Sequence, residues 1–580
     1  MESSQTVSYF KKVEELLRLL TILNLTGYRW PDPACVRNGA SYDFVVIGGG
    51  AAGCLVASQL VETGNASVLL VEAGGYPPIE SELAGLFAYL KGSEHDWNFT
   101  STCGSASSTH KDNVISMSQG KMLGGSSSLG YLVYGHGSPH DYDEWAAITN
   151  DPSWSYDSIL PIMQRSEQLI DHLLQNCSHY YGTDGEIKLQ KQYYPRNRPY
   201  FQALKEIGYN CYLDINPDHP LGFTSFLFTI GDDVRQTTAL KYISPLKNHP
   251  NLDLLINALA TKIVFDENNN AVGVKILKEN GRTITVRANK EVIVTAGTIK
   301  SPQLLMLSGI GPSGHLQNKG IEVIADLPVG KNFQDHVNSF LLYKMTRSGH
   351  ASSVEDPHKY PYAGFEGYGA LNKNQSYPDF NLICAHFGDR DTFLGLCAFF
   401  FSFDNEFCDS LGEGLDDKEA FLVFVTNLNP ESRGEILLAS KNPEDNPVIL
   451  PGYFTESIDL ENQANYLADF NRVLNTTYFR RMDAELVTVG FESCAEFPMF
   501  SEDYWKCHAL KTLDTSHYFV GTCAMGSVLD SRLRVRGVNK LRVADASAMP
   551  TNVRSYTLAT VHMIAQKATE MIIEEHRLRG

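Results

Sequence analysis

The chain has 580 residues, of which 43% are hydrophobic and 20% charged, a composition typical of folded globular proteins rather than disordered ones. Its 48 Lys and Arg residues against 67 Asp and Glu give a net charge of -19, which argues against nucleic acid or an anionic membrane surface as the main partner. No run of 18 or more apolar residues occurs, so we expect no membrane-spanning helix.

The N-terminal region, residues 1–39, mixes charged and apolar residues at helical spacing and carries Arg18 within its apolar part. This pattern favours an amphipathic helix docked on the body over a cleavable signal peptide. The sequence therefore favours a soluble, cytoplasmic protein, with secretion as the alternative. Six N-x-S/T sequons are weak evidence for secretion, because this composition yields several by chance: Asn24, Asn65, Asn98, Asn176, Asn374 and Asn475.

The 11 cysteines are odd in number and scattered along the chain. None of them forms a C-x-x-C pair. This distribution argues against a zinc site and against a disulfide framework.

A nucleotide-binding pattern begins at the short, β-branched run Phe44–Ile47, which is typical of a buried parallel strand. Gly48, Gly50 and Gly53 follow it as G-x-G-x-x-G, and helical apolar spacing continues through Leu60. The first glycine permits a tight turn, the second lets backbone amides approach a pyrophosphate, and the third packs helix on strand.

A second buried run, Ser67–Val71, ends in Glu72, which lies 19 positions after Gly53. A carboxylate at this distance can hold a ribose hydroxyl. Strand, helix, strand and acid in this order predict a dinucleotide site. The glycine pattern alone does not separate NAD from FAD.

Two later motifs add to this fold. Residues 120–145, "GKMLGGSSSLGYLVYGHGSPHDYDEW", contain a Gly-Ser loop, Gly124–Ser128, whose backbone amides can face an anionic or electron-rich ligand edge. Residues 297–312, "GTIKSPQLLMLSGIGP", follow the buried strand "EVIVTA" and predict a second strand–turn–helix unit on the same sheet.

These colinear motifs resemble the glucose–methanol–choline (GMC) flavoprotein oxidoreductases, and the likeness covers nearly the whole chain from Tyr42 onward. The wording "HDYDEW", the "SRGEI" strand and the helical leader look most like the insect branch, and within it the ecdysone oxidases of moths. The motifs are the fingerprint, Gly120–Trp145, Gly297–Gly311, Pro328–Val337, Asn429–Ile436 and Leu541–Val553.

The resemblance implies an α/β fold in which a Rossmann-like FAD domain is interleaved with an α+β substrate domain on an antiparallel sheet. The FAD domain would comprise residues 40–155, 242–340 and 515–580, and the substrate domain residues 156–241 and 341–514. The activity implied is oxidation of an alcohol, with FAD as the cofactor and dioxygen or another electron acceptor.

The same resemblance assigns cofactor-binding residues. They are Gly48, Gly50, Gly53, Glu72 and Ala73 for the ADP half, Lys121, Gly125 and Ser126 beside the flavin or pyrophosphate, Ile263 near the adenine, and Asp545 and Ala546 at the ribityl–pyrophosphate region. The alternative for Asp545 is a helix cap or turn residue. The chain departs from the family at Gly130, where the flavin loop usually has Asn.

Oxidation of an alcohol by flavin needs a base for the hydroxyl proton, and the family supplies it from a His. Aligned on "VGTC", that position is Tyr518, and the second catalytic position, aligned on "MPTNV" and the closing helix, is Tyr556. An unperturbed tyrosine has a pKa of about 10 and is a poor base at neutral pH unless it is activated. His517 is one residue out of register, so it faces away if the segment is a strand and reaches the site if the segment is irregular.

Three functions remain open. The first is an active alcohol oxidase whose base is His517 or an activated Tyr518/Tyr556 pair. The second is a flavoprotein of this fold with a non-redox, lyase-type reaction. The third is a protein that retains FAD and binds a hydrophobic ligand without catalysis.

Aromatic residues are dense in three candidate substrate walls: residues 359–370, 397–407 and 497–505. With few basic residues nearby, these walls suit a bulky, neutral, mainly apolar alcohol. The branch resemblance favours an ecdysteroid, oxidised from the 3-hydroxy to the 3-oxo form with dioxygen reduced to hydrogen peroxide. No feature of the sequence indicates the oligomeric state.

Overall fold

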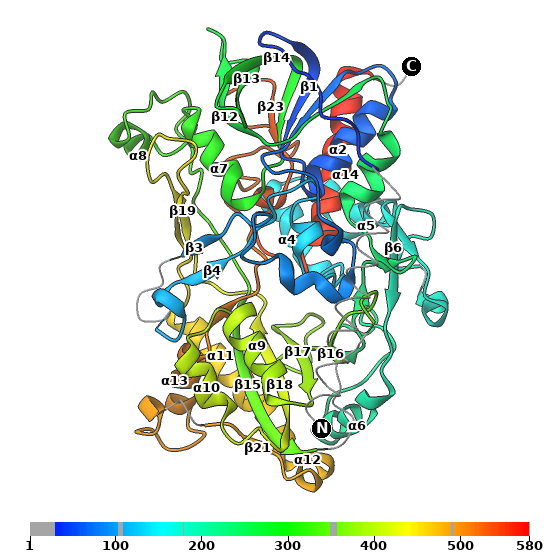
Figure 1. Ribbon diagram of the computed structural model, residues 1–580, viewed down its shortest axis with the longest axis vertical. Coiled ribbons are helices and arrows are strands. Elements are labelled where there is room, and N and C mark those ends of the chain that lie inside the picture. Colours follow the sequence, from blue (N-terminus) through cyan, green and yellow to red (C-terminus); the bar gives the residue numbers. More distant parts are fainter. Residues whose placement is uncertain (1–28, 102–107, 178, 348–355, 489–491, 579–580) are drawn as a thin grey trace, which may run out of the picture.

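The computed structural model describes residues 29–101, 108–177, 179–347, 356–488 and 492–578 (Figure 1). The predicted N-terminal helix, within residues 1–28, lies outside them. Residues 29–39 are not helical; they run beside the first sheet, where Pro33 bridges Leu254.

The upper part of the molecule in Figure 1 is built on a seven-stranded sheet of order β11-β2-β1-β14-β13-β12, with β23 beside β14. β11, β2, β1, β14 and β23 run parallel, whereas β12 and β13 form an antiparallel meander onto β14. The strands are β1 (Ser41–Ile47), β2 (Val68–Val71), β11 (Leu252–Leu255), β12 (Ala258–Phe265), β13 (Ala271–Lys278), β14 (Thr283–Val294) and β23 (Leu541–Val543).

Three helices pack on this sheet. α2 (Ala51–Glu62) and α14 (Leu558–His576) contact each other, and α7 (Gly297–Leu307) contacts β12 (Figure 1). A Cβ on Gly53 would lie 1.9 Å from the backbone oxygen of Gly48, so α2 approaches the end of β1 as closely as only glycine allows. The predicted strands on either side of the glycines, and the second strand–helix unit, are confirmed.

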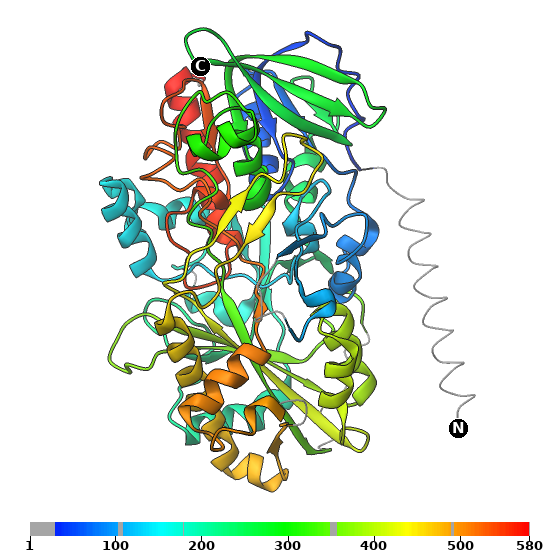
Figure 2. The ribbon, with the colours of Figure 1, turned by 90° about the vertical axis from the view of Figure 1, so that its left-hand side faces the viewer.

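The lower part of the molecule is built on a second seven-stranded sheet of order β21-β15-β18-β17-β16-β7, with β22 beside β15 (Figures 1 and 2). All of its pairs are antiparallel. The strands are β7 (Gly222–Thr224), β15 (Val337–Thr346), β16 (Gly364–Gly369), β17 (Phe380–Phe387), β18 (Lys418–Asn427), β21 (Glu485–Leu486) and β22 (Asp514–Thr515).

Short elements connect and cover the two sheets. The remaining helices are α3 (Ser126–Leu129), α4 (Pro139–Thr149), α5 (Tyr156–Gln164), α6 (Arg198–Glu206), α8 (Ser313–Asn318), α9 (Arg390–Gly395), α10 (Asn405–Gly412), α11 (Ser457–Asn471), α12 (Thr477–Arg481) and α13 (Glu502–Lys511). The remaining strands are β3 (Phe99–Ser101), β4 (Ile115–Met117), β5 (Glu167–Leu169), β6 (Ile187–Lys191), β8 (Leu227–Phe228), β9 (Ile230–Gly231), β10 (Val234–Arg235), β19 (Glu435–Leu437) and β20 (Val448–Leu450).

The two sheets draw their strands from alternating stretches of the chain. The strands of the first sheet come from residues 41–71, 252–294 and 541–543. Those of the second sheet come from residues 222–224 and 337–515. The α/β class with a separate antiparallel sheet is therefore confirmed. We propose the predicted domain boundaries as the limits of two domains, each built on one sheet.

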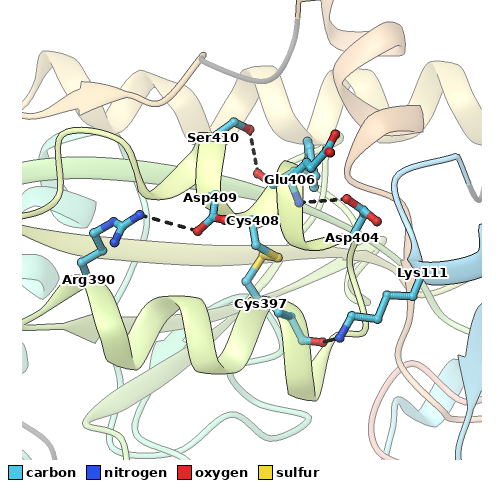
Figure 3. The surroundings of a disulfide bond; sticks show 10 residues. Lys111, Arg390, Cys397, Asp404, Glu406, Cys408, Asp409 and Ser410 are labelled. Atoms are coloured by element: carbon cyan, nitrogen blue, oxygen red, sulfur yellow. Dashed lines mark hydrogen bonds and ion pairs between the residues drawn. A yellow bond between two sulfur atoms is a disulfide. The ribbon is translucent and has the colours of Figure 1, made fainter.

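Two disulfides contradict the expectation drawn from cysteine spacing. Cys397 is bonded to Cys408 on α10 (Figure 3), and Cys494 to Cys507 on α13. Each pair is closed within a local turn between helices, 11 and 13 residues apart in sequence. Such a pairing depends on how the helices pack, and it leaves no short motif in the sequence. The scattered positions of the cysteines therefore gave no sign of these disulfides.

In the described parts of the chain, no helix combines the length and apolarity needed to cross a membrane.

Candidate active site

A large cavity opens at the carboxyl ends of the parallel strands, where residues after β1, β2 and β14 meet. Ligands of open α/β sheets bind in this position. This first cavity encloses ≈ 1820 Å³, including the part that is open to solvent. It extends from the glycines of the first strand–turn–helix unit to the segment Ser516–Phe519.

One end of the first cavity is a cradle of bare backbone. Gly48 has φ +105°, and a Cβ there would lie 2.5 Å from the backbone oxygen of Thr295. A Cβ on Gly125, at the start of α3, would lie 2.7 Å from Cα of Gly50. Because both loops lack side chains here, amides at the start of α2 can approach a pyrophosphate closely.

Glu72 closes this cradle. Its Oε2 accepts a hydrogen bond from Gly49 N at 2.7 Å, and its Oε1 accepts one from Gly74 N at 2.8 Å. Burial raises the pKa of this carboxyl to about 7, against these amide hydrogen bonds. The carboxylate is thus fixed at the cavity wall, where its remaining lone pairs can accept ribose hydroxyls.

Lys300 is a cation that sequence reasoning missed. It lies on α7 at the cavity wall, and its Nζ is buried with no hydrogen-bond partner among the described residues. The ammonium lies 4.4 Å from the centre of the Trp97 ring, and burial, aided by Lys121, lowers its pKa to about 8. A buried ammonium without an acceptor suits the phosphates of a dinucleotide.

Most of the predicted cofactor residues line the first cavity: Gly48, Gly50, Glu72, Ala73, Gly125, Ser126, Asp545 and Ala546. Gly53, Lys121 and Ile263 are not part of its wall. Gly53 acts by letting α2 pack closely. Ile263 is fully buried, and residues 258–260, at the start of the same strand, line the cavity instead.

Asp545 is a helix cap, which was the alternative to a cofactor-binding role. Its Oδ1 accepts from Ser547 N at 2.8 Å, which caps a short 3-10 helix, and its Oδ2 accepts from Gly297 N at 2.8 Å and from Ser301 Oγ at 2.6 Å. The carboxylate thereby joins the start of α7 to the segment after β23. We propose that Asp545 and Ala546 border the cofactor mainly through their backbone.

At the opposite end, His517, Tyr518 and Tyr556 all line the first cavity. β22 ends at Thr515, and His517 has φ 62°, a left-handed conformation that breaks any strand alternation. His517 and Tyr518, although adjacent in sequence, therefore contribute to the same wall. Of the two alternatives, the irregular segment is the one the structure has.

The segment that carries Tyr518 is held by residues of two family motifs. Asp335 Oδ1 accepts from Tyr518 N at 3.1 Å, and its Oδ2 accepts from Thr515 Oγ1 at 2.5 Å. Asn552 Nδ2 donates to the Tyr518 carbonyl at 3.1 Å. Asp335 and Asn552 were not predicted as site residues, although each lies within a motif that had been identified.

The two tyrosines contact each other edge to face, with ring centres 5.6 Å apart. Tyr556 Oη donates a hydrogen bond to Glu366 Oε2 at 2.7 Å. Burial and nearby carboxylates raise the pKa of both phenols well above the ordinary value. Neither tyrosine alone is therefore a base at neutral pH. Tyr556 lies two residues before α14, which begins at Leu558.

His517 is a weak base in this setting. Burial, followed by the charge of Lys91, lowers its pKa well below the ordinary value. Its ring therefore stays neutral at pH 7 but has little affinity for a proton. It can still form one hydrogen bond to a ligand in the cavity.

The predicted aromatic walls are largely wrong. The described side chains of residues 397–407 and 497–505 are not part of the cavity wall. Several of them pack into the core of the second sheet and its helices, for example Phe401 on Phe424, whereas Phe500 is exposed. The aromatic and apolar lining comes instead from Phe87, Tyr131 and Leu132, beside the tyrosines. Aromatic density in sequence could not distinguish a wall from a core.

Arg235 contacts the backbone of the loop at Gly130, the position where the chain departs from the family. The buried guanidinium donates to the Gly130 carbonyl at 2.6 Å and lines the first cavity. Together with Lys91 and Lys300, it gives this cavity three basic side chains, more than the sequence had suggested. The loop that carries Ser126 is thus anchored by a side chain from β10.

Comparison with known proteins identifies the family. A sequence profile described as "GMC oxidoreductase" matches residues 42–338, and a second profile with the same description matches residues 430–565. The chain belongs to the GMC oxidoreductase family. It is an FAD-dependent oxidoreductase, and alcohols are its class of substrate.

Similar proteins match more than nine-tenths of the chain. An ecdysone oxidase from Spodoptera littoralis is 37% identical over 94% of this chain and 94% of its own length. An ecdysone oxidase from Bombyx mori is 35% identical over 95% of this chain and 85% of its own length. Formate oxidase from Aspergillus oryzae has the same fold, with a TM-score of 0.80 and 24% identity over 93% of this chain and all of its own.

The residues present fit FAD. The glycine cradle matches a pyrophosphate, and the fixed Glu72 carboxylate matches a ribose. The Lys300 ammonium, which has no hydrogen-bond acceptor among the described residues, matches an anionic charge. The cavity continues past α3 to Tyr518 and Tyr556, so one continuous space connects the cofactor cradle with the candidate catalytic residues.

Proposed function

We propose that this protein oxidises the 3-hydroxyl of an ecdysteroid-like alcohol to a ketone, with dioxygen as the electron acceptor and hydrogen peroxide as the second product. The observation that carries the proposal is that His517, Tyr518 and Tyr556 share one cavity with the cofactor cradle. The apolar lining beside them suits a bulky neutral alcohol. The names of the two moth relatives supply the substrate and acceptor.

Bound FAD supplies the hydride acceptor. The chain's own residues orient the alcohol and remove its proton. We propose that Tyr518 donates a hydrogen bond to the alcohol oxygen and that Tyr556 Oη receives the hydroxyl proton. Phe87, Tyr131 and Leu132 exclude water from the reacting carbon, and His517 contributes one hydrogen bond to the substrate.

The substrate is tested by anaerobic reduction of the purified holoenzyme. We expect ecdysone to bleach the flavin absorbance and glucose, choline and small aryl alcohols to leave it unchanged. After air is admitted, hydrogen peroxide should form in step with the 3-oxo product. Bleaching by glucose but not by ecdysone would contradict the proposal that the substrate is an ecdysteroid.

The same experiment also tests the two alternative functions, a non-redox reaction and ligand binding without catalysis. If no alcohol bleaches the flavin but a hydroxylated compound is cleaved or rearranged, the protein is a non-redox enzyme of this fold. If ecdysteroids bind without any turnover, it is an FAD-retaining binding protein.

We propose further that the protein works in an oxidising compartment, which replaces the cytoplasmic preference drawn from the sequence. The disulfides support this, because cytosolic proteins keep their thiols reduced. Two sequon asparagines in the second domain, Asn374 and Asn475, are exposed and accessible to glycosylation.

Reduction should destabilise the protein. Closing 11 residues of chain, the Cys397–Cys408 bond is expected to add roughly 3 kcal/mol to the free energy of unfolding. We expect the double variant C397S/C408S to unfold at correspondingly lower denaturant concentration, and C35S, which changes an exposed unpaired cysteine, to match the wild type. If all four of these cysteines were alkylated in the native protein without reductant, they would be free thiols, and the proposal of an oxidising compartment would be wrong.

A further inference from the structure

One hydrogen bond joins the first cavity to a second, separate one. Tyr556 is part of the wall of the first cavity, and its Oη donates to Glu366 Oε2 at 2.7 Å. Glu366 lies on β16 and is part of the wall of the second cavity, as is Ser555, the residue before Tyr556. The Tyr556–Glu366 pair therefore forms part of the partition between the two spaces.

Buried polar and charged side chains contribute to the wall of the second cavity. Besides Glu366, it is lined by Tyr368, two positions along β16 on the same face, and by the buried ion pair of Lys191 and Asp214, with Nζ and Oδ1 3.2 Å apart. Its outer wall includes the half-exposed residues Asn216 and Pro217. Glu366 is thus buried but lies next to a space whose wall includes polar side chains and reaches half-exposed residues.

The pKa of Glu366 lies close to 7, because burial and the groups around the carboxyl act largely in opposite directions. Burial raises its pKa to about 7, while the hydrogen bond from Tyr556, the Lys191 ammonium and Tyr368 lower it and Asp214 raises it. The phenols of Tyr181 and Tyr518 face the same carboxyl. An acid with this pKa can accept and release protons at the pH at which an enzyme works.

We propose that the proton removed from the alcohol comes to rest on Glu366, transferred through the hydroxyl of Tyr556, and leaves by way of the second cavity. This inference rests on the proposed function. As the alcohol O–H bond breaks, its proton bonds to Tyr556 Oη, and the proton already on Oη moves to Glu366 Oε2. Bound FAD would accept the hydrogen of the carbon together with its electron pair, which leaves the C=O bond of the ketone.

This relay resolves the difficulty that both catalytic positions are tyrosines. A phenol that only accepted a proton would become a strong acid, and one that only donated could not act as base. Tyr556 does neither overall, because it gains one proton and gives up another. Glu366 is a positioning residue and the final acceptor, although it does not touch the substrate.

The first test replaces the acceptor without removing its hydrogen bond. Glu366→Gln keeps an oxygen that can accept from Tyr556 but cannot take a proton. With any alcohol that reduces the wild type, we expect flavin reduction at least ~10²-fold slower and without the rise through about pH 7 that an ionising Glu366 gives the wild type. The matched control is Tyr209→Phe, which breaks a tyrosine–carboxylate bond, to Asp469, away from both cavities; its rate should be unchanged.

The second test does not depend on turnover. Infrared difference spectra of the wild type between pH 5 and pH 9 should contain a protonated carboxyl that titrates near pH 7 and is missing in E366Q. In Tyr556→Phe, the same band should titrate at higher pH, because the hydrogen bond that favours the ionised form is lost.

The outcomes separate the two proposals. An infrared band unchanged in Y556F, or an E366Q rate and pH profile equal to those of the wild type, would overturn the relay. If no alcohol bleaches the flavin of the wild type but the infrared band behaves as expected, the proton exchange between Tyr556 and Glu366 is confirmed and the proposed oxidation is wrong. If E366Q does not fold, the Y556F spectra alone decide.

Discussion

Gly53→Ala is expected to yield a protein without flavin and with a much lower free energy of unfolding. The added Cβ would lie 1.9 Å from the backbone oxygen of Gly48, and no side chain can rotate to relieve that contact. The turn between β1 and α2 must open, at a cost of about 3 kcal/mol or more. Opening it also moves the amides at the start of α2 away from the pyrophosphate.

The measurement is the ratio of flavin to protein absorbance after purification, together with chemical unfolding. Gly64→Ala is the matched control, since Gly64 lies just after α2 with φ +76° and nothing within 4 Å of a new Cβ. That variant introduces backbone strain of roughly 1–2 kcal/mol but no clash, so it should keep its flavin. G53A with full flavin content would show that close packing at this position is not required.

The cofactor end of the site could be predicted from the sequence because it is made of local backbone. Gly48, Gly50 and Glu72 act through a single turn and the strand after it, so their spacing along the chain fixes their spacing in space. Lys121 and Ile263 were exceptions, because neither is part of the cavity wall. Ile263 lies on the right strand, but which strand residues face a cavity depends on packing from the other layer.

The reaction end could be predicted only in part. His517, Tyr518 and Tyr556 were found through motifs, and they do line one cavity. Glu366 comes from a different sheet, 190 positions from Tyr556 in sequence, and no pattern in either segment announces their hydrogen bond. Arg235 and Lys300 were missed for the same reason, because a buried cation is recognisable only once its surroundings are assembled.

The question of which residue takes the proton changes once these long-range contacts are known. From sequence, the choice lay between a displaced His517 and a pair of tyrosines with unsuitable pKa values. In the structure, His517 is a neutral and weakly basic ring, whereas Tyr556 is bonded to a carboxylate whose pKa is about 7. Proton affinity therefore favours the pair that carries the carboxylate.

Tyr556→Phe is accordingly expected to lower the rate of anaerobic flavin reduction by about 10²-fold or more, while His517→Ala lowers it by less than about 10-fold. The phenylalanine keeps the ring that packs on Tyr518 and removes only the hydroxyl. Substrate affinity, measured from the concentration dependence of the reduction rate, should change little in Y556F. The two single variants are compared by stopped-flow spectrophotometry at pH 8, where Glu366 is ionised.

The double variant Y556F/E366Q decides whether the two groups act as one device. If the proton must cross Tyr556 to reach Glu366, removing either blocks the same step, and the double variant should be no slower than the slower single variant. Independent contributions would instead multiply, to about 10⁴-fold or more. A multiplied loss, or an H517A variant slower than Y556F, would return the role of base to a group other than Tyr556.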